Sequence, residues 1–178
     1  MKKIPTIFKR NPENMGELLD EPHPDCQWVF DGEGVATKKY DGTCVMINSD
    51  GYFKRREVKF APEDFVEIDY DETTGKKVGW VPIKQDDPND KYHILAFYSG
   101  LSEGTYELVG PKIQGNPEKY PVHILIKHSE ATPYGYVPRT FEGIKQWLKD
   151  KDTEGIVFHH PDGRMGKIKK KDFNQNRT

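Results

Sequence analysis

The alternation of apolar and polar residues along this chain predicts mainly short β-strands joined by turns. Turns rich in glycine, proline, asparagine or aspartate separate several of these strand patterns, as expected for antiparallel connections. The predicted strands cover residues 34–48 (a hairpin or strand pair around Lys39), 52–60, 69–81 (a hairpin with a turn at 73–75), 104–110, 122–127, 155–158 and 165–173.

Two stretches have helical character instead. Residues 13–19 predict a short helix that ends before two prolines. A second helix is predicted after Thr140, a suitable N-cap, because Phe141, Ile144, Trp147 and Leu148 recur at helical spacing. Many strands with few helices indicate an α+β fold. We expect one domain over residues 1–178, in which residues 1–30 have the weakest pattern.

Composition narrows the class of protein. The 178 residues are 34% hydrophobic, 31% charged and 12% aromatic, which suits a globular chain with a proper core. Lys and Arg total 27 against 29 Asp and Glu, so a local basic groove is compatible with the sequence but a general polyanion-binding surface is not. The two cysteines form no metal or redox motif, and no signal peptide or membrane span is visible. A cytoplasmic location is therefore expected.

The stretch Lys39-Tyr40-Asp41-Gly42 is the strongest chemical signal. A lysine amine is a nucleophile once deprotonated, and neighbouring positive charge lowers a lysine pKa. Lys38 is adjacent, and further lysines lie near the C-terminus. Asp41 could orient the amine, and Gly42 allows the backbone to approach a ligand closely. A lysine-rich surface turn produces the same four residues, so this motif alone leaves both interpretations open.

Two carboxylates stand in or beside apolar strands, where an unpaired charge is costly. Glu107 lies within Thr105–Gly110 and could accept a hydrogen bond from a ribose hydroxyl. Glu154 precedes Gly155–Phe158, and alternation predicts that it shares a face with Ile156 and Phe158. Glu154 could help to hold Mg²⁺, which prefers oxygen ligands. Solvent-facing glutamates at strand edges are the alternative for both.

Basic residues supply the third signal. Lys167, Lys169 and Lys171 would share one face of the last strand and could contact phosphate, although a solvated basic tail has the same composition. Arg56 or its neighbour Arg55 could contact phosphate or a base, because guanidinium makes planar bidentate contacts. The chain has no P-loop motif, no nucleophile-elbow motif, and no zinc or EF-hand spacing.

The chain resembles the covalent nucleotidyltransferase superfamily of ligases and mRNA capping enzymes. The resemblance lies in an ordered set of motifs: Lys39-Tyr40-Asp41-Gly42, Arg56, Glu107, Glu154-Gly155-Ile156-Val157 and Lys167-Ile168-Lys169. Within this superfamily the chain is most similar to small ATP-dependent RNA ligases of the RNA ligase 1 type. The resemblance covers residue 30 onward and is carried by residues 36–44, 79–82, 106–110, 115–117 and 153–159. Lys38 departs from the acidic residue common before the nucleophile, which affects the expected adenine pocket.

This resemblance implies a fold, a reaction and a set of roles. The fold would be two antiparallel sheets flanking a nucleotide groove, an adenylation domain without an OB-fold. Lys39 would attack ATP to form lysyl-AMP, and AMP would pass to an RNA 5′-phosphate that a 3′-hydroxyl then attacks. The implied ATP-binding residues are Lys39, Asp41, Arg56, Glu107, Glu154, Lys167 and Lys169, with Thr37, Lys38 and Arg55 as further candidates. Glu154 would bind Mg²⁺ or Mn²⁺.

The same residues are compatible with other functions. A capping-type guanylyltransferase would use GTP in place of ATP. A nucleic-acid-binding module with a degenerate site would bind RNA without becoming adenylated, and a DNA ligase would seal nicked DNA. Covalent labelling by radioactive ATP or GTP distinguishes a ligase, a guanylyltransferase and a binding module. A comparison of nicked DNA with single-stranded or nicked RNA as substrate identifies a DNA ligase.

Overall fold

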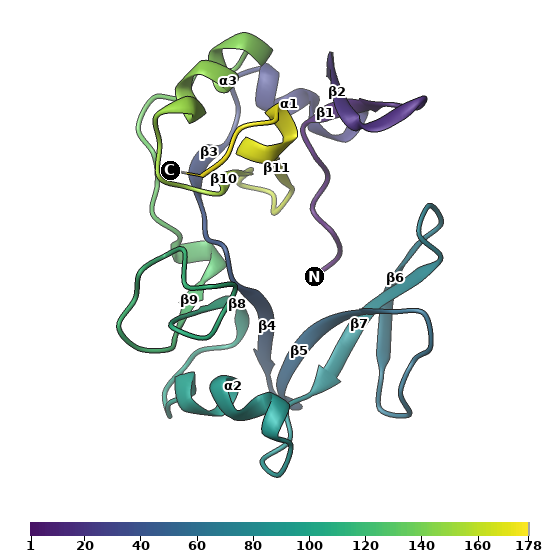
Figure 1. Cartoon of the computed structure of the whole chain (residues 1–178), viewed down its shortest axis with the longest axis vertical. Coiled ribbons are helices and arrows are strands. Elements are labelled where there is room, and N and C mark those ends of the chain that lie inside the picture. The colour runs from purple at the N-terminus through teal and green to yellow at the C-terminus, as the bar shows by residue number, and fades with distance from the viewer. Residues whose placement is uncertain (178) are drawn as a thin grey trace. The chain divides into compact units, whose positions relative to one another are not determined.

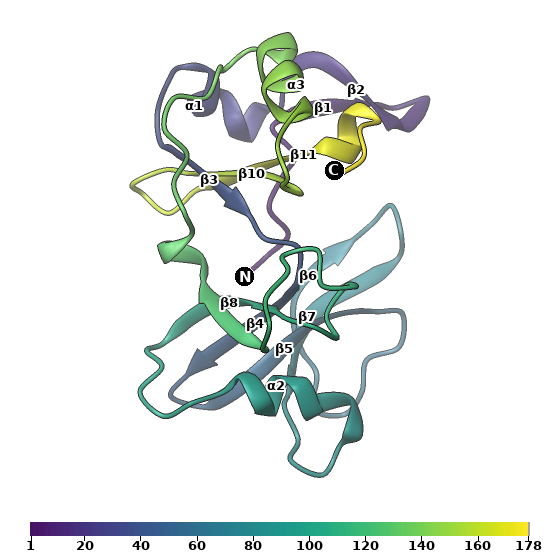
Figure 2. The ribbon, with the colours of Figure 1, turned by 60° about the vertical axis from the view of Figure 1, so that its left-hand side comes forward.

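The computed structural model describes residues 1–177, which form two compact units (Figures 1 and 2). The central unit comprises residues 1–3 and 41–130, and the terminal unit comprises residues 4–40 and the described residues from 131 onward. The chain therefore passes from one unit to the other immediately after Tyr40, next to the predicted nucleophile.

The terminal unit carries a small antiparallel sheet with strand order β11-β10-β3, and a separate β1-β2 hairpin (Figure 2). Its elements are β1 (Phe8–Asn11), β2 (Asn14–Pro22), η1 (Pro24–Cys26), α1 (Gln27–Phe30), β3 (Val35–Lys39), α3 (Phe141–Lys149), β10 (Gly155–His159), β11 (Met165–Lys169) and η4 (Lys170–Phe173).

One face of this sheet forms the core of the terminal unit. Ile156, Phe158 and Ile168 are fully buried there, together with Ile144 and Leu148 of α3. The helix begins as its N-cap predicts, because the Thr140 side chain accepts a hydrogen bond from the Gly143 amide. Burial of this face leaves the opposite face of the sheet for polar side chains.

The central unit is built on a larger antiparallel sheet with strand order β6-β7-β5-β4-β8-β9. Its elements are β4 (Thr43–Asn48), β5 (Gly51–Val58), β6 (Val66–Asp71), β7 (Lys76–Pro82), η2 (Pro88–Asp90), α2 (Lys91–Ala96), β8 (Gly104–Val109), β9 (Ile124–Lys127) and η3 (His128–Glu130). Ala96 of α2 belongs to the same buried cluster as Val45, Ile47 and Leu108, so this short helix packs against one face of the sheet. Figure 1 shows it near the lower end of β4 and β5.

These elements confirm the α+β prediction and the predominance of antiparallel strands. The helix predicted over residues 13–19 is wrong, because this segment belongs to β2, which pairs with β1. Leu18 is the one buried side chain of β2. Met15, Leu18 and Leu19 have helical spacing, but a helix of so few residues is marginally stable, whereas the hairpin satisfies the backbone through its partner strand.

Two further predictions need correction. The strands on either side of the Lys39 turn do not pair with each other, because β3 pairs with β10 and β4 pairs with β5 and β8. The last strand ends at Lys169 and continues as η4, so Lys171 is not on the strand. The Lys170 side chain is buried, and its ammonium donates to backbone oxygens of Lys149 and Lys151. These two hydrogen bonds satisfy the buried ammonium at the start of η4.

None of the helices that the structure describes is both long enough and apolar enough to cross a membrane.

Candidate functional site

Lys39 and Lys169 lie on one face of the terminal-unit sheet, on either side of Gly155. Gly155 pairs with Lys39 on β3 and with Lys169 on β11, and directly paired residues in antiparallel strands share a face. A Cβ atom at position 155 would lie 2.1 Å from the Ile168 carbonyl oxygen. The absence of a side chain at Gly155 therefore lets the strand carrying Lys169 approach closely.

Glu154 joins the two lysines. Its Oε2 lies 2.5 Å from the Nζ of Lys39, and its Oε1 lies 3.0 Å from the Nζ of Lys169. All three side chains are between 16% and 25% exposed, so the group is partly shielded but accessible. One carboxylate between two ammonium groups leaves a net positive charge, which suits a polyphosphate ligand.

The contact with Glu154 differs from the sequence expectation in two ways. Alternation predicted that Glu154 shares the face of Ile156 and Phe158, which is wrong because those two side chains are in the core while the Glu154 carboxylate reaches the lysines. Glu154 precedes the first residue of β10, so strand alternation does not govern its direction. In addition, the partner contacting the Lys39 ammonium is a carboxylate, whereas the sequence indicates neighbouring lysines around Lys39.

The next row of the same face contains Thr37 and Lys167, both opposite Val157. Lys167 therefore shares a face with Lys169, as predicted. Thr37 is buried, and its hydroxyl donates to the Val157 carbonyl oxygen at 2.9 Å, so it links the two strands. Lys38 pairs with Ile156 and belongs to the opposite face, where its Nζ lies 5.2 Å from the Tyr40 ring centroid.

In the central unit, Glu107 is held by a histidine that sequence reasoning missed. The Nε2 of His128 lies 2.8 Å from Oε2 of Glu107, and its Nδ1 lies 2.9 Å from the Thr105 hydroxyl. Both Glu107 and Thr105 are on β8, two residues apart, and His128 begins η3 directly after β9. The only sequence signal would have been a histidine following a predicted strand, which is too common to be informative.

The two adjacent arginines lie on opposite faces of the central-unit sheet. Met46 pairs with both Phe53 and Thr105, so these three residues share a face. Arg55 is two residues after Phe53, and Glu107 is two residues after Thr105, so both lie on that same face. Arg56 lies on the other face, with the buried Lys54. Arg55 is half-buried and Arg56 is exposed, so Arg55 is the arginine that the fold places with Glu107, although the sequence argument favoured Arg56.

Asp41 and Gly42 are fixed within the central unit by a hydrogen bond to a side chain and by close backbone packing, respectively. The Asp41 amide donates to Oε1 of Glu118 at 3.0 Å. A Cβ atom at Gly42 would lie 2.1 Å from the Leu108 carbonyl oxygen, so glycine is required for this close approach to β8. Glu118 was not identified from the sequence, because it lies in an irregular loop 77 residues away.

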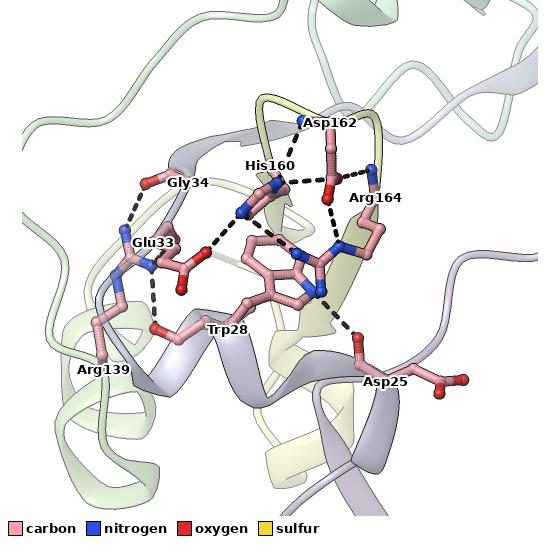
Figure 3. Close-up of polar contacts among 9 residues, drawn as sticks. Asp25, Trp28, Glu33, Gly34, Arg139, His160, Asp162 and Arg164 are labelled. Carbon is pink, nitrogen blue, oxygen red and sulfur yellow. Dashed lines mark hydrogen bonds and ion pairs between the residues drawn. The ribbon is translucent and has the colours of Figure 1, made fainter.

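A polar network closes the β10–β11 hairpin against α1 (Figure 3). The His160 ring lies between Glu33, 2.6 Å from its Nε2, and Asp162, 2.8 Å from its Nδ1. Arg164 contacts Asp162 at 2.8 Å and lies over the Trp28 ring, with its guanidinium carbon 5.7 Å from the centroid. This network anchors the turn that leads into the lysine-bearing strand β11.

A surface pocket of about 470 Å³ opens beside this network. It is lined by Pro5, Pro24, Asp25, Gln27, Trp28, Arg164 and Met165. None of the site residues predicted from the sequence lines it, so the pocket and the lysine group are separate features of the terminal unit.

The candidate metal ligand is a single carboxylate. Within residues 1–177, no group of three or more His, Cys, Asp and Glu side chains is arranged to hold a metal ion. Mg²⁺ commonly uses one or two protein carboxylates, with substrate phosphates and water completing its coordination. Glu154 fits that minimal role, since it lies beside two lysines suited to phosphate.

Comparison with known proteins assigns the chain to a protein family. A family model described as RNA ligase 1 matches residues 80–176, just over half of the chain. This chain belongs to the RNA ligase 1 family. The matched region of the family includes Glu107, His128, Glu154, Lys167 and Lys169, whereas Lys39 and Arg55 precede it.

Curated relatives support the same membership. RNA ligase 1 of Danio rerio is 36% identical over 76 residues, 38% of this chain and 23% of that protein. RNA ligase 1 of Rattus norvegicus is 32% identical over 91 residues, 47% of this chain and 28% of that protein. The matches thus span about a quarter of the length of these RNA ligase 1 proteins.

Proposed function

We propose that this RNA ligase 1 family member is an ATP-dependent RNA ligase that joins a 5′-phosphate to a 3′-hydroxyl through a lysyl-AMP intermediate on Lys39. The observation that carries the proposal is the group formed by Lys39, Glu154 and Lys169. A lysine at a strand end, paired with a carboxylate and accompanied by a second lysine, has the components needed to attack a phosphorus atom and to neutralise phosphate charge.

In the proposed first step, Nζ of Lys39 bonds to the α-phosphorus of ATP, and the bond from that phosphorus to the bridging oxygen of pyrophosphate breaks. The ammonium loses one proton before the attack and a second after the bond forms. Glu154 Oε2, 2.5 Å from Nζ, is within reach to accept a proton. Lys169 and Lys167 would bind phosphate oxygens from the same sheet face.

The later steps return the lysine to its starting state. An oxygen of the RNA 5′-phosphate bonds to the AMP phosphorus, and the bond from that phosphorus to Nζ of Lys39 breaks. A 3′-hydroxyl then attacks the RNA phosphorus, forming the phosphodiester and releasing AMP. These are phosphoryl transfers, in which positioning and charge neutralisation supply most of the rate enhancement.

Mg²⁺ or Mn²⁺, when bound, would neutralise charge on the reacting phosphates. Glu154 is the residue of this chain proposed to contact the ion. In the central unit, Glu107 is proposed to accept a hydrogen bond from the nucleotide ribose, and Arg55 is proposed to contact phosphate, because it shares the Glu107 face.

Covalent labelling tests the proposal. Purified protein is incubated with ATP radiolabelled at the α-phosphate and a divalent cation, and protein-bound label is measured after denaturation. We expect label on the wild type, loss of label in Lys39→Ala, and retention in the control variant Lys9→Ala, because Lys9 is an exposed lysine of β1 that has no proposed role in the site. Isolated adenylated protein should then seal a 5′-phosphorylated RNA without further ATP.

Each alternative gives a different result. Labelling by GTP in place of ATP would identify a guanylyltransferase. RNA binding with no label from either nucleotide would identify a binding module, and sealing of nicked DNA in preference to RNA would identify a DNA ligase.

A further inference from the structure

One oxygen of the Glu107 carboxylate is hydrogen-bonded to a protein side chain, and the other is available to a ligand. Its Oε2 contacts Nε2 of His128 at 2.8 Å, whereas Oε1 makes no hydrogen bond to any described residue. The side chain is 15% exposed, so the available oxygen is held in a partly buried position on the face that also carries Arg55. Oε1 is not among the buried unpartnered atoms, so it is accessible to a hydrogen-bond donor on a ligand.

The contacts of His128 determine its tautomer. An ionised carboxylate only accepts hydrogen bonds, so Nε2 must carry the proton that is shared with Glu107. The Thr105 hydroxyl can donate to Nδ1 or accept from it, so it anchors the ring in either protonation state. Two contacts on opposite nitrogens prevent the ring from rotating, and the Glu107 carboxylate is consequently held in one orientation.

We propose that His128 is a positioning residue that orients Glu107 to accept a hydrogen bond from a ribose hydroxyl, and so makes the protein discriminate ribonucleotides from deoxyribonucleotides. This proposal rests on the proposed adenylation function for the identity of the ligand. An acceptor held in one orientation binds a ligand that carries the hydroxyl more tightly, whereas a ligand that lacks the hydroxyl leaves the acceptor without a hydrogen bond. This difference in binding is an effective basis for selectivity.

Two substitutions of His128 separate its contacts. In His128→Gln the amide nitrogen can replace Nε2 as the donor to Glu107, whereas the shorter amide of His128→Asn can replace only the Nδ1 contact with Thr105. Thr105→Val removes the second anchor while preserving side-chain volume. From this geometry we expect the largest loss of ribose preference in His128→Asn. His128→Gln and Thr105→Val should show intermediate losses.

The main experiment measures Lys39 adenylation against concentrations of ATP, 2′-deoxy-ATP and 3′-deoxy-ATP. The wild type should prefer ATP over one deoxy analogue. His128→Asn should raise KM for ATP by about tenfold, as expected for loss of an oriented charged hydrogen bond, with kcat less affected. The KM for the discriminated deoxy analogue should stay nearly constant, so the preference disappears.

Other results would overturn the proposal. An equal rise in KM for ATP and the deoxy analogues in His128→Asn, with a lowered unfolding temperature, would mean that His128 only stabilises the fold. Absence of any ribose preference in the wild type would also refute it, as would an unchanged preference in His128→Asn.

A second measurement remains decisive if the wild type fails to form lysyl-AMP and the proposed function is wrong. Nitrogen-15 NMR of histidine-labelled protein, assigned by loss of the signal in His128→Asn, should show an Nε2–H imidazole at His128. Addition of adenosine should shift this signal more than addition of the deoxyadenosine lacking the recognised hydroxyl. An Nδ1–H tautomer, or equal shifts with all nucleosides, would contradict the assignment.

Discussion

Lys39 and Glu154 are separated by 115 residues in the chain, and their side chains meet at 2.5 Å. The contact depends on the pairing of β3 with β10, since Gly155, the residue after Glu154, lies opposite Lys39. The carboxylate also contacts Lys169, so its removal would leave two ammonium groups on one face without their shared counter-charge.

Glu154→Gln should therefore lower the rate of lysyl-AMP formation by about 100-fold or more, because the amide cannot accept a proton or provide charge. Protein-bound label after a timed reaction measures this rate. Glu13→Gln, which neutralises an exposed carboxylate in the turn between β1 and β2, is the matched control and should be unaffected. Full activity in Glu154→Gln would remove Glu154 from the proposed mechanism.

Arg55→Ala should impair adenylation or RNA sealing by about tenfold, whereas Arg56→Ala should leave both within twofold. The physical reason is that strand alternation places Arg55 on the Glu107 face and Arg56 on the opposite one. The two variants remove the same charge from neighbouring positions, so each is the control for the other. A larger defect in Arg56→Ala would show that the opposite face is the functional one.

Gly155→Ala should destabilise the protein by about 1–3 kcal/mol, because the added methyl group would contact the Ile168 carbonyl oxygen and force β10 and β11 apart. Adenylation should fall as well, since Lys39 and Lys169 flank this position. Gly135→Ala is the control, because a Cβ there meets nothing within 4 Å and its change should stay below about 0.5 kcal/mol. Chemical denaturation measures the free energy of unfolding of both variants. Equal stability of the two variants would argue against the tight strand approach.

Stability of the central unit should decrease as the pH falls below the ordinary pKa of histidine. Burial lowers the pKa of His93, an effect that attraction to Asp90 opposes and repulsion from Lys54 reinforces. The unfolded chain then binds a proton at His93 more readily than the folded chain does, so acidification favours unfolding. Neither ring nitrogen of His93 has a hydrogen-bond partner, so no hydrogen bond offsets the cost of placing a charge there.

Unfolding temperatures measured from about pH 7.5 to about pH 5 test this dependence. His93→Leu should flatten the decline, because it removes the titrating group from the buried site. An identical decline in both proteins would assign the acid sensitivity to other residues.

Local signals in the sequence correctly predicted several elements. The helix after Thr140 follows from a cap and an apolar stripe, and both act within a few residues. Most strands likewise follow from alternation. The segment over residues 13–19 was predicted wrongly, because its pairing with β1 outweighs a weak helical preference.

The sequence by itself determined which chemical groups this protein carries: the Lys39 motif, two carboxylates near strands, and lysines at alternating positions on β11. Tertiary structure alone decided which of them meet. Strand register brought Glu154 to Lys39, placed Arg55 and not Arg56 beside the Glu107 face, and set His128 against Glu107. Side-chain periodicity is a local property of the backbone, and it limits register because one face of each strand must be buried. Which distant strands pair with each other depends in addition on how their buried faces pack together in the folded chain.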